Sequence, residues 1–114
     1  MTLGSWGELA AEKYLKKEGY IILERNYRCR IGELDIIALD GDCMVFVEVK
    51  TRQSQSFGLP CEAVHQEKIR HIKRTAAYYL MMNPYNDFDQ RIDVLEILRI
   101  DAQAYLRHVK NITG

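Results

Sequence analysis

The segment from residue 33 to residue 52, ELDIIALDGDCMVFVEVKTR, most constrains what this chain can fold into. Two runs rich in β-branched and apolar residues, 33–39 and 44–50, are separated by the short segment Asp40–Cys43, which contains Asp-Gly. Asp-Gly between apolar runs is a strong hairpin signal, so we expect two antiparallel strands here. Both runs also contain charged side chains, and the predicted fold must explain why these charges lie within apolar strands.

The length of the turn decides whether the acids Asp35 and Glu48 share a face of the sheet, because side chains alternate along a strand. A two-residue loop at Asp40-Gly41 makes Glu48 the diagonal neighbour of Asp35 on the same face. A four-residue loop, Asp40–Cys43, places the two acids directly opposite each other, whereas a three-residue loop puts them on opposite faces. Two of the three simplest registers therefore bring the Cβ atoms within roughly 4.5–8 Å of each other.

Two carboxylates at that separation repel each other unless a cation lies between them. A hard divalent ion such as Mg²⁺ accepts carboxylate oxygens and keeps positions for water and a phosphate oxygen. Lys50, on the face of Glu48, would then contact a scissile phosphate or the attacking water. The alternative is a solvent-facing hairpin whose charges pair weakly across the strands. Against that alternative, Ile37 and Phe46 share the face of the acids, so the face is at least partly buried.

The segments around the hairpin predict the remaining elements. Apolar residues at helical spacing from Ser5, a candidate N-cap, to Gly19 predict a first helix. The extended stretch from Tyr20 to about Arg30 predicts a strand. A second helix is expected from about Cys61 to Met82, apolar on one side and rich in Lys and Arg on the other. The run Arg91–Leu98 predicts a fourth strand.

The predicted order is α-β-β-β-α-β, which indicates an α/β fold with a mixed central sheet flanked by helices. The helix after the hairpin makes the last connection a right-handed crossover, so strand four should lie parallel to strand three. Residues 51–60 are expected to form a polar loop. Residues 101–110 fit either a short helix or an edge strand.

The composition limits the number of domains and sites. A chain of 114 residues suffices for one core, so we expect a single domain over residues 1–114. Sixteen basic and sixteen acidic residues give a formal net charge of zero, so any phosphate-binding face must be local. The cysteines, Cys29, Cys43 and Cys61, lack CxxC spacing and neighbouring histidine pairs, and neither a disulfide framework nor a zinc site is indicated.

The sequence also bears on location. No apolar run reaches the roughly 20 residues needed to span a bilayer. The N-terminal segment MTLGSWGELAAEKY carries an acid where a secretion signal needs its apolar core. We therefore expect a cytoplasmic protein with no membrane partner.

Five ordered blocks carry a family resemblance: GELAAEKYL, N-Y-R-x-R-x-GELDIIA, VFVEVKTR, FG-x-P-x-EAV-x-x-x-K and R-I-D-V. With an acid thirteen residues before an E-x-K triplet, they resemble the YraN-like family of small bacterial proteins. That family belongs to the restriction-endonuclease-like PD-(D/E)xK superfamily and is related to archaeal Holliday-junction resolvases. Leu34 stands where the superfamily name has proline, a position that does no chemistry.

The resemblance implies a Mg²⁺- or Mn²⁺-dependent endonuclease that hydrolyses phosphodiester bonds in DNA, with branched or structured DNA as an expected substrate. It implies that Asp35 and Glu48 are metal ligands, with the Val49 carbonyl as a third. Lys50 would be the amine directed at phosphate or water. Glu8 matches the first-helix acid that completes the site in the resolvase relatives.

The resemblance also places basic residues for the DNA backbone at Arg52 and Lys68, and by analogy it suggests a homodimer. Glu8 has a second reading, because S-x-x-E from Ser5 has the form of a capping box. Asp93 is expected to pair structurally with an arginine, with support of the metal site as the other option. Two other functional readings stay open: a catalytically silent nuclease-like fold that binds DNA or protein, and a plain structural domain.

Overall fold

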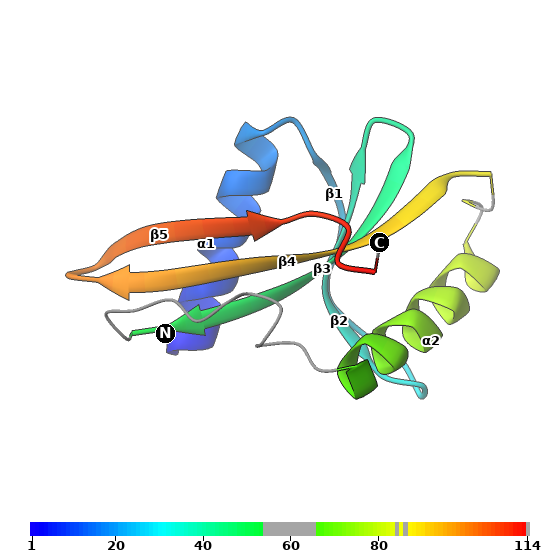
Figure 1. Ribbon diagram of the computed structural model, residues 1–114, viewed down its shortest axis with the longest axis horizontal. Helices are drawn as coiled ribbons and strands as arrows, with labels where there is room; N and C mark the ends of the chain where they lie inside the picture. Colours follow the sequence, from blue (N-terminus) through cyan, green and yellow to red (C-terminus); the bar gives the residue numbers. More distant parts are fainter. Residues whose placement is uncertain (54–65, 84, 86, 114) are drawn as a thin grey trace.

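The structure is a computed structural model that describes residues 1–53, 66–83, 85 and 87–113. Its elements, in chain order, are α1 (Leu3–Lys17), β1 (Ile21–Arg28), β2 (Glu33–Asp40), β3 (Cys43–Arg52), α2 (Gln66–Met82), β4 (Asp89–Ile100) and β5 (Gln103–Val109). The strands form one sheet in the order β1-β2-β3-β4-β5 (Figure 1). Strands β3 and β4 are parallel and the other neighbours are antiparallel. The predicted α/β fold with strand four parallel to strand three is confirmed.

The two helices cover opposite faces of the sheet. On one face, α2 covers an apolar cluster that includes Ile37, Met44 and Phe46. On the other face, α1 covers a cluster that includes Ile36 and Val45. In Figure 1, α1 crosses behind β3 to β5, whereas α2 lies apart from it at the lower right. Because neighbouring residues of β2 and β3 serve different helices, the central strands are buried on both sides.

Helix α1 begins earlier than the sequence predicted. Thr2 is the N-cap: its hydroxyl accepts a hydrogen bond from the Ser5 N–H at 3.1 Å, and the Ser5 hydroxyl accepts one from the Thr2 N–H at 3.2 Å. The expected N-cap at Ser5, with a capping box to Glu8, is therefore wrong. A hydroxyl residue can serve at either position of such a box, so the motif alone did not decide between them. Glu8 takes no part in the cap.

The hairpin has a two-residue turn. Leu39 lies opposite Met44 and Asp40 opposite Cys43, which leaves residues 41–42 as the turn. The register is the one predicted for the four-residue alternative, with the outer two residues of that loop paired as the last rung of the ladder. The turn therefore contains an even number of residues, which places Asp35 and Glu48 on the same face of the hairpin.

The ends of the chain's later elements differ in detail from the predictions. Strand β3 continues to Arg52, two residues into the predicted loop, and residues 103–109 form an edge strand, which decides between the two options left open. Residues 54–60 of that loop and the predicted start of the second helix at Cys61 lie outside the described residues. Cys29 and Cys43 are free thiols. Neither described helix combines the length and apolar character needed to cross a membrane.

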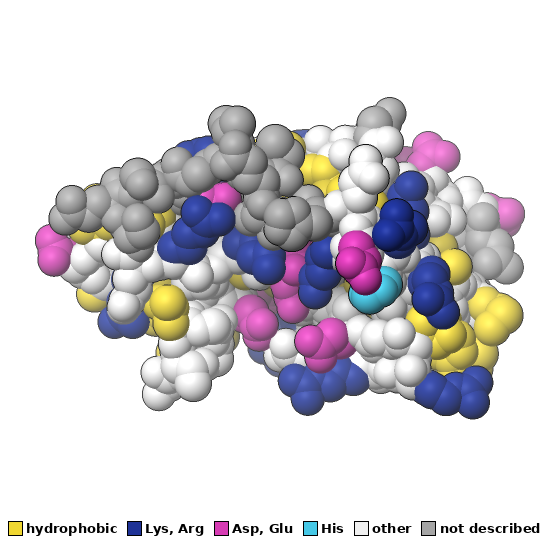
Figure 2. Space-filling view, turned by 60° about the horizontal axis from the view of Figure 1, so that its bottom comes forward, with side chains coloured by type: hydrophobic (Ala, Val, Ile, Leu, Met, Phe, Trp, Pro, Cys, Tyr) yellow, Lys and Arg dark blue, Asp and Glu magenta, His cyan; other side chains and the backbone are white. Residues whose placement is uncertain are grey.

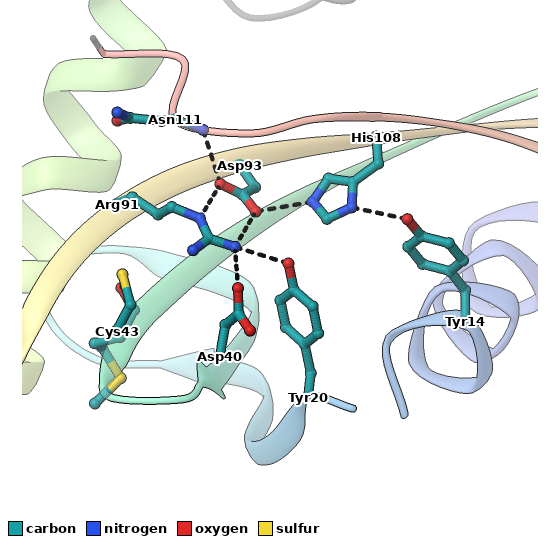
Figure 3. A network of polar contacts seen from close by, with 9 residues as sticks. Tyr14, Tyr20, Asp40, Cys43, Arg91, Asp93, His108 and Asn111 are labelled. Atoms are coloured by element: carbon teal, nitrogen blue, oxygen red, sulfur yellow. Dashed lines mark hydrogen bonds and ion pairs between the residues drawn. The ribbon is translucent and has the colours of Figure 1, made fainter. Parts of the chain in front are cut away.

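A buried polar network fastens β4 and β5 to α1 (Figure 3). The Asp93 carboxylate, fully buried, accepts hydrogen bonds from Arg91 Nε at 3.0 Å, His108 Nε2 at 2.8 Å and the Asn111 N–H at 2.9 Å. His108 Nδ1 lies 3.0 Å from the hydroxyl of Tyr14. Burial alone would raise the pKa of Asp93, but these three hydrogen bonds lower it. The structural pairing of Asp93 with an arginine, predicted from the sequence, is confirmed.

Candidate active site

The site lies where β2 separates from β3. The paired residues of these strands run from the turn to Ile36 and Val47, and β3 continues beside β4 as far as Arg52. At the end of the ladder, the Val49 N–H donates to Asp35 Oδ2 at 2.8 Å. A side-chain carboxylate thus takes the position of a main-chain acceptor, which fixes the acid of β2 against the E-x-K triplet of β3.

Glu48 is the buried member of an acid pair. Continuing the register by one residue places it opposite Asp35. Its side chain is 8% exposed. Burial, and next the charge of Asp35, raise the pKa of Glu48 to about 7. The geometry therefore brings together the two carboxylates that the sequence singled out, at a cost in charge repulsion and desolvation.

Two lysines from different elements converge on this acid pair. The Nζ atoms of Lys50, on β3, and Lys68, on α2, each lie 3.6 Å from Glu48 Oε2. Both ammonium groups oppose the rise in the pKa of Glu48 without cancelling it. Figure 2 shows a face of the molecule on which Asp and Glu side chains gather near the middle, with Lys and Arg side chains on either side of them. The arrangement provides acceptors and cations at one place.

Glu8 approaches Asp35 from the other side of the sheet. Helix α1 approaches β3 closely at Gly7, where an added Cβ would lie 2.8 Å from the Thr51 Cβ. This approach places Glu8 near Asp35; burial and then the Asp35 charge raise the pKa of Glu8. Glu8 and Asp35 line a hollow of about 200 Å³ together with residues of α1, β1 and β2, among them Asn26. The hollow is open to a small group such as water.

The oxygen donors present suit a hard divalent cation. The carboxylates of Asp35 and Glu48 face each other, and the N–H and C=O of one residue in an extended strand leave the same edge, so the Val49 carbonyl lies on the side of Asp35. The described part of the chain holds no cluster of three or more His, Cys, Asp or Glu side chains that could hold a metal. Two carboxylates with a carbonyl fit Mg²⁺, which keeps several waters and needs one or two carboxylates.

Sequence reasoning missed Glu96, a further acid beside the site. Glu96 lies on β4 opposite Lys50 and is fully buried. Its Oε1 is 3.9 Å from Nη1 of Arg52, whose side chain is 35% exposed. Neither Glu96 carboxylate oxygen has a hydrogen-bond partner among the residues described. An acid inside an apolar strand, the signal that identified Asp35, was present here too and could have found it.

Comparison with known proteins shows the family of the chain. The model of an uncharacterised protein family, UPF0102, matches residues 7–97. The chain belongs to this family. A UPF0102 protein of Clostridium acetobutylicum is 53% identical over 95 residues, which cover 83% of this chain and 78% of the relative. A UPF0102 protein of Alkaliphilus metalliredigens is 43% identical over 110 residues, 96% of both chains.

The UPF0102 family has a restriction-endonuclease-like fold, so the family resemblance drawn from the sequence blocks is confirmed. A UPF0102 protein of Caldanaerobacter subterraneus, 44% identical over 111 residues, extends the likeness to 97% of this chain and 91% of the relative. The names of these relatives state no activity. The function of the chain must therefore be argued from the site.

Proposed function

We propose that this UPF0102 protein is a Mg²⁺- or Mn²⁺-dependent endonuclease that hydrolyses phosphodiester bonds in DNA. The observation that carries the proposal is the meeting of Asp35, Glu48 and Lys50 where β2 separates from β3. An acid pair with one buried member, mutually repulsive and faced by an ammonium group, has the composition of a cation and phosphate site.

Asp35 and Glu48, with the Val49 carbonyl, would hold the metal ion, which supplies a more acidic water and offsets negative charge on the phosphate when bound. Lys50 would contact the scissile phosphate or the attacking water and stabilise the charge that develops there. Glu8 borders the hollow beside Asp35 and would orient the attacking water.

DNA would be contacted through its phosphates. Arg52 and Lys68, whose side chains are 35% and 42% exposed, stand on either side of the site and would neutralise backbone charge. The outer face of α2 adds exposed cations: Arg70, Lys73 and Arg74. These groups make a local basic surface on a protein of zero formal net charge, which favours backbone contacts over base readout.

The test is incubation of the purified protein with branched and linear DNA in Mg²⁺ or Mn²⁺. We expect cleavage by the wild type and a loss of roughly 100-fold or more in Asp35→Ala, Glu48→Ala and Lys50→Ala. Asp42→Ala, at the exposed turn of the same hairpin, is the matched control and should cut normally. Cutting that persists in Asp35→Ala or Glu48→Ala would refute the assignment. Light scattering on the same samples tests the homodimer that the resemblance suggests.

A second function is supported by the charge balance: a nuclease-like fold that binds DNA or protein without turnover. A net charge of zero is unusual for a protein whose work is nonspecific contact with a polyanion. Salt-dependent DNA binding without cleavage, unchanged in Asp35→Ala, would support this second function and exclude the first.

A further inference from the structure

Apart from the β-bulge between Ile22 and Glu24 in β1, side-chain alternation also fails at one facing position of β1 and β2. In β2, Leu34 packs on the α2 side and Ile36 on the α1 side, although they are two residues apart. In β1, Arg25 bonds an acid of α1, whereas Tyr27 packs against a tyrosine of α2. Residues i and i+2 share a face in a regular strand, so the residue between them is irregular in both strands.

The two irregular residues, Asn26 and Asp35, occupy opposing positions of the β1–β2 ladder, because the pairs on either side of them are in register. Asn26 has a φ of 50°, in the left-handed region. Asparagine enters this region more readily than most other residues, although glycine does so most easily. The left-handed turn directs Asn26 to the α1 side of the sheet, where Arg25 already lies.

On that side Asn26 lies beside Glu8, and its amide lowers the pKa of Glu8, as a donor near a carboxylate does. Both residues and Asp35 line the hollow described above. If the irregularity served only to re-aim the backbone, glycine would serve it better, since glycine has no steric penalty at this φ. The contact with Glu8 requires a side chain that can donate to a carboxylate, and the asparagine amide can.

We propose that Asn26 is a positioning residue of the candidate active site, whose left-handed backbone turns its carboxamide toward Glu8 and holds the Glu8 carboxylate beside Asp35. The catalytic consequence of the inference rests on the proposed nuclease function, and the contact itself rests on the left-handed backbone of Asn26 and the hollow that it shares with Glu8. Asn26 itself does not touch the reacting phosphate; it acts through Glu8.

The test separates the backbone of Asn26 from its amide. Asn26→Gly keeps the left-handed conformation and removes only the carboxamide. We expect kcat for DNA cleavage to fall about 10- to 100-fold, as for other groups that orient a site residue, with KM unchanged. In a Glu8→Ala background the same substitution should change kcat less than about twofold, because the residue through which it acts is gone. The control is Asn111→Gly: Asn111 is also left-handed, with φ 54°, and exposed, and its bond to Asp93 uses the main chain.

A second readout needs no activity. Urea unfolding of the wild type, Asn26→Gly, Glu8→Ala and the double variant should give a coupling of roughly 2- to 10-fold in the unfolding equilibrium constant, the worth of one hydrogen bond. Additive effects in unfolding would overturn the contact. If the two substitutions are coupled in unfolding but their effects on kcat are additive, the contact stands and only its catalytic consequence is overturned. If the wild type cuts no DNA under any condition, the proposed function fails and the unfolding cycle still decides whether Asn26 positions Glu8.

Discussion

Replacing Glu48 with glutamine should stabilise the protein above pH 7, although it removes a residue of the candidate active site. Glutamine has the shape of glutamate and no charge, so the substitution isolates the cost of ionising this acid in its place. That cost arises from burial and from the neighbouring charge of Asp35, which outweigh the two lysines at 3.6 Å.

The magnitude and the pH window follow from the pKa. The pKa of Glu48 is raised from 4.5 to about 7, and one pKa unit corresponds to about 1.4 kcal/mol, so ionised Glu48 lowers the free energy of unfolding by about 3 kcal/mol. Because the unfolded chain ionises near 4.5 and the folded chain near 7, unfolding releases a proton between these values. The wild type should therefore lose stability as the pH rises from 4.5 to 7 and stay level above.

The assay is urea unfolding followed by circular dichroism at pH 5, 6, 7 and 8. Wild type and Glu48→Gln should be similar in stability near pH 5, and the variant should be the more stable by about 3 kcal/mol at pH 8. Glu33→Gln serves as the control, since Glu33 is exposed and its ion pair among the described residues is with exposed Arg28 at 3.4 Å, a contact worth less than about 1 kcal/mol. If the difference in the free energy of unfolding between Glu48→Gln and wild type is the same at all four pH values, the reasoning is refuted.

Three further outcomes are expected. Mn²⁺ should raise the thermal midpoint of the wild type more at pH 8 than at pH 5 and leave that of Glu48→Gln nearly unchanged, as a thermal-shift titration would show. Gly7→Ala should cost about 1–3 kcal/mol in urea unfolding because its Cβ would overlap Thr51; Gly4→Ala, 3.9 Å from its nearest neighbour, should be neutral or stabilising by about 1 kcal/mol. Asp93→Asn should cost about 3–5 kcal/mol by calorimetry, since it removes the fully buried partner of Arg91, whose side chain is 15% exposed.

The parts of the fold that were predictable depend on signals between near neighbours in the chain. The Asp-Gly pair and the alternation around it predicted the hairpin, whereas the parity of its turn stayed open until the register of β2 and β3 decided it. The helical spacing of apolar residues predicted both helices, and the order of elements predicted that β4 is parallel to β3. Each of these features is decided by local geometry or by a general rule of chain connection.

The features that sequence did not predict depend on which of two equivalent local patterns the fold selects. Thr2 and Ser5 are both good caps, and the helix begins at the earlier of the two, with Ser5 as the partner in the capping box. Glu96 carries the same signal as Asp35, yet its place opposite Lys50 follows from the register of a parallel pair, which no turn specifies. The register between strands that are distant in the sequence is decided by packing, and the alternation of side chains along one strand gives no information about packing.

Asp35 has Glu8 and Glu48 as separate charged neighbours, and alternation alone could find these acids without explaining how Asp35 lies near both. Glu8 comes from the α1 side of the sheet, whereas Glu48 faces Lys68 of α2. A regular sheet would keep these sides apart, because its strands form a continuous layer between them. The layer is interrupted at one place: the β2–β3 pairing stops before Asp35, which is itself irregular and lies opposite left-handed Asn26. Asp35 can therefore have a charged neighbour on each side, and the distortion that violates the period-two rule is what places both Glu8 and Glu48 near its carboxylate.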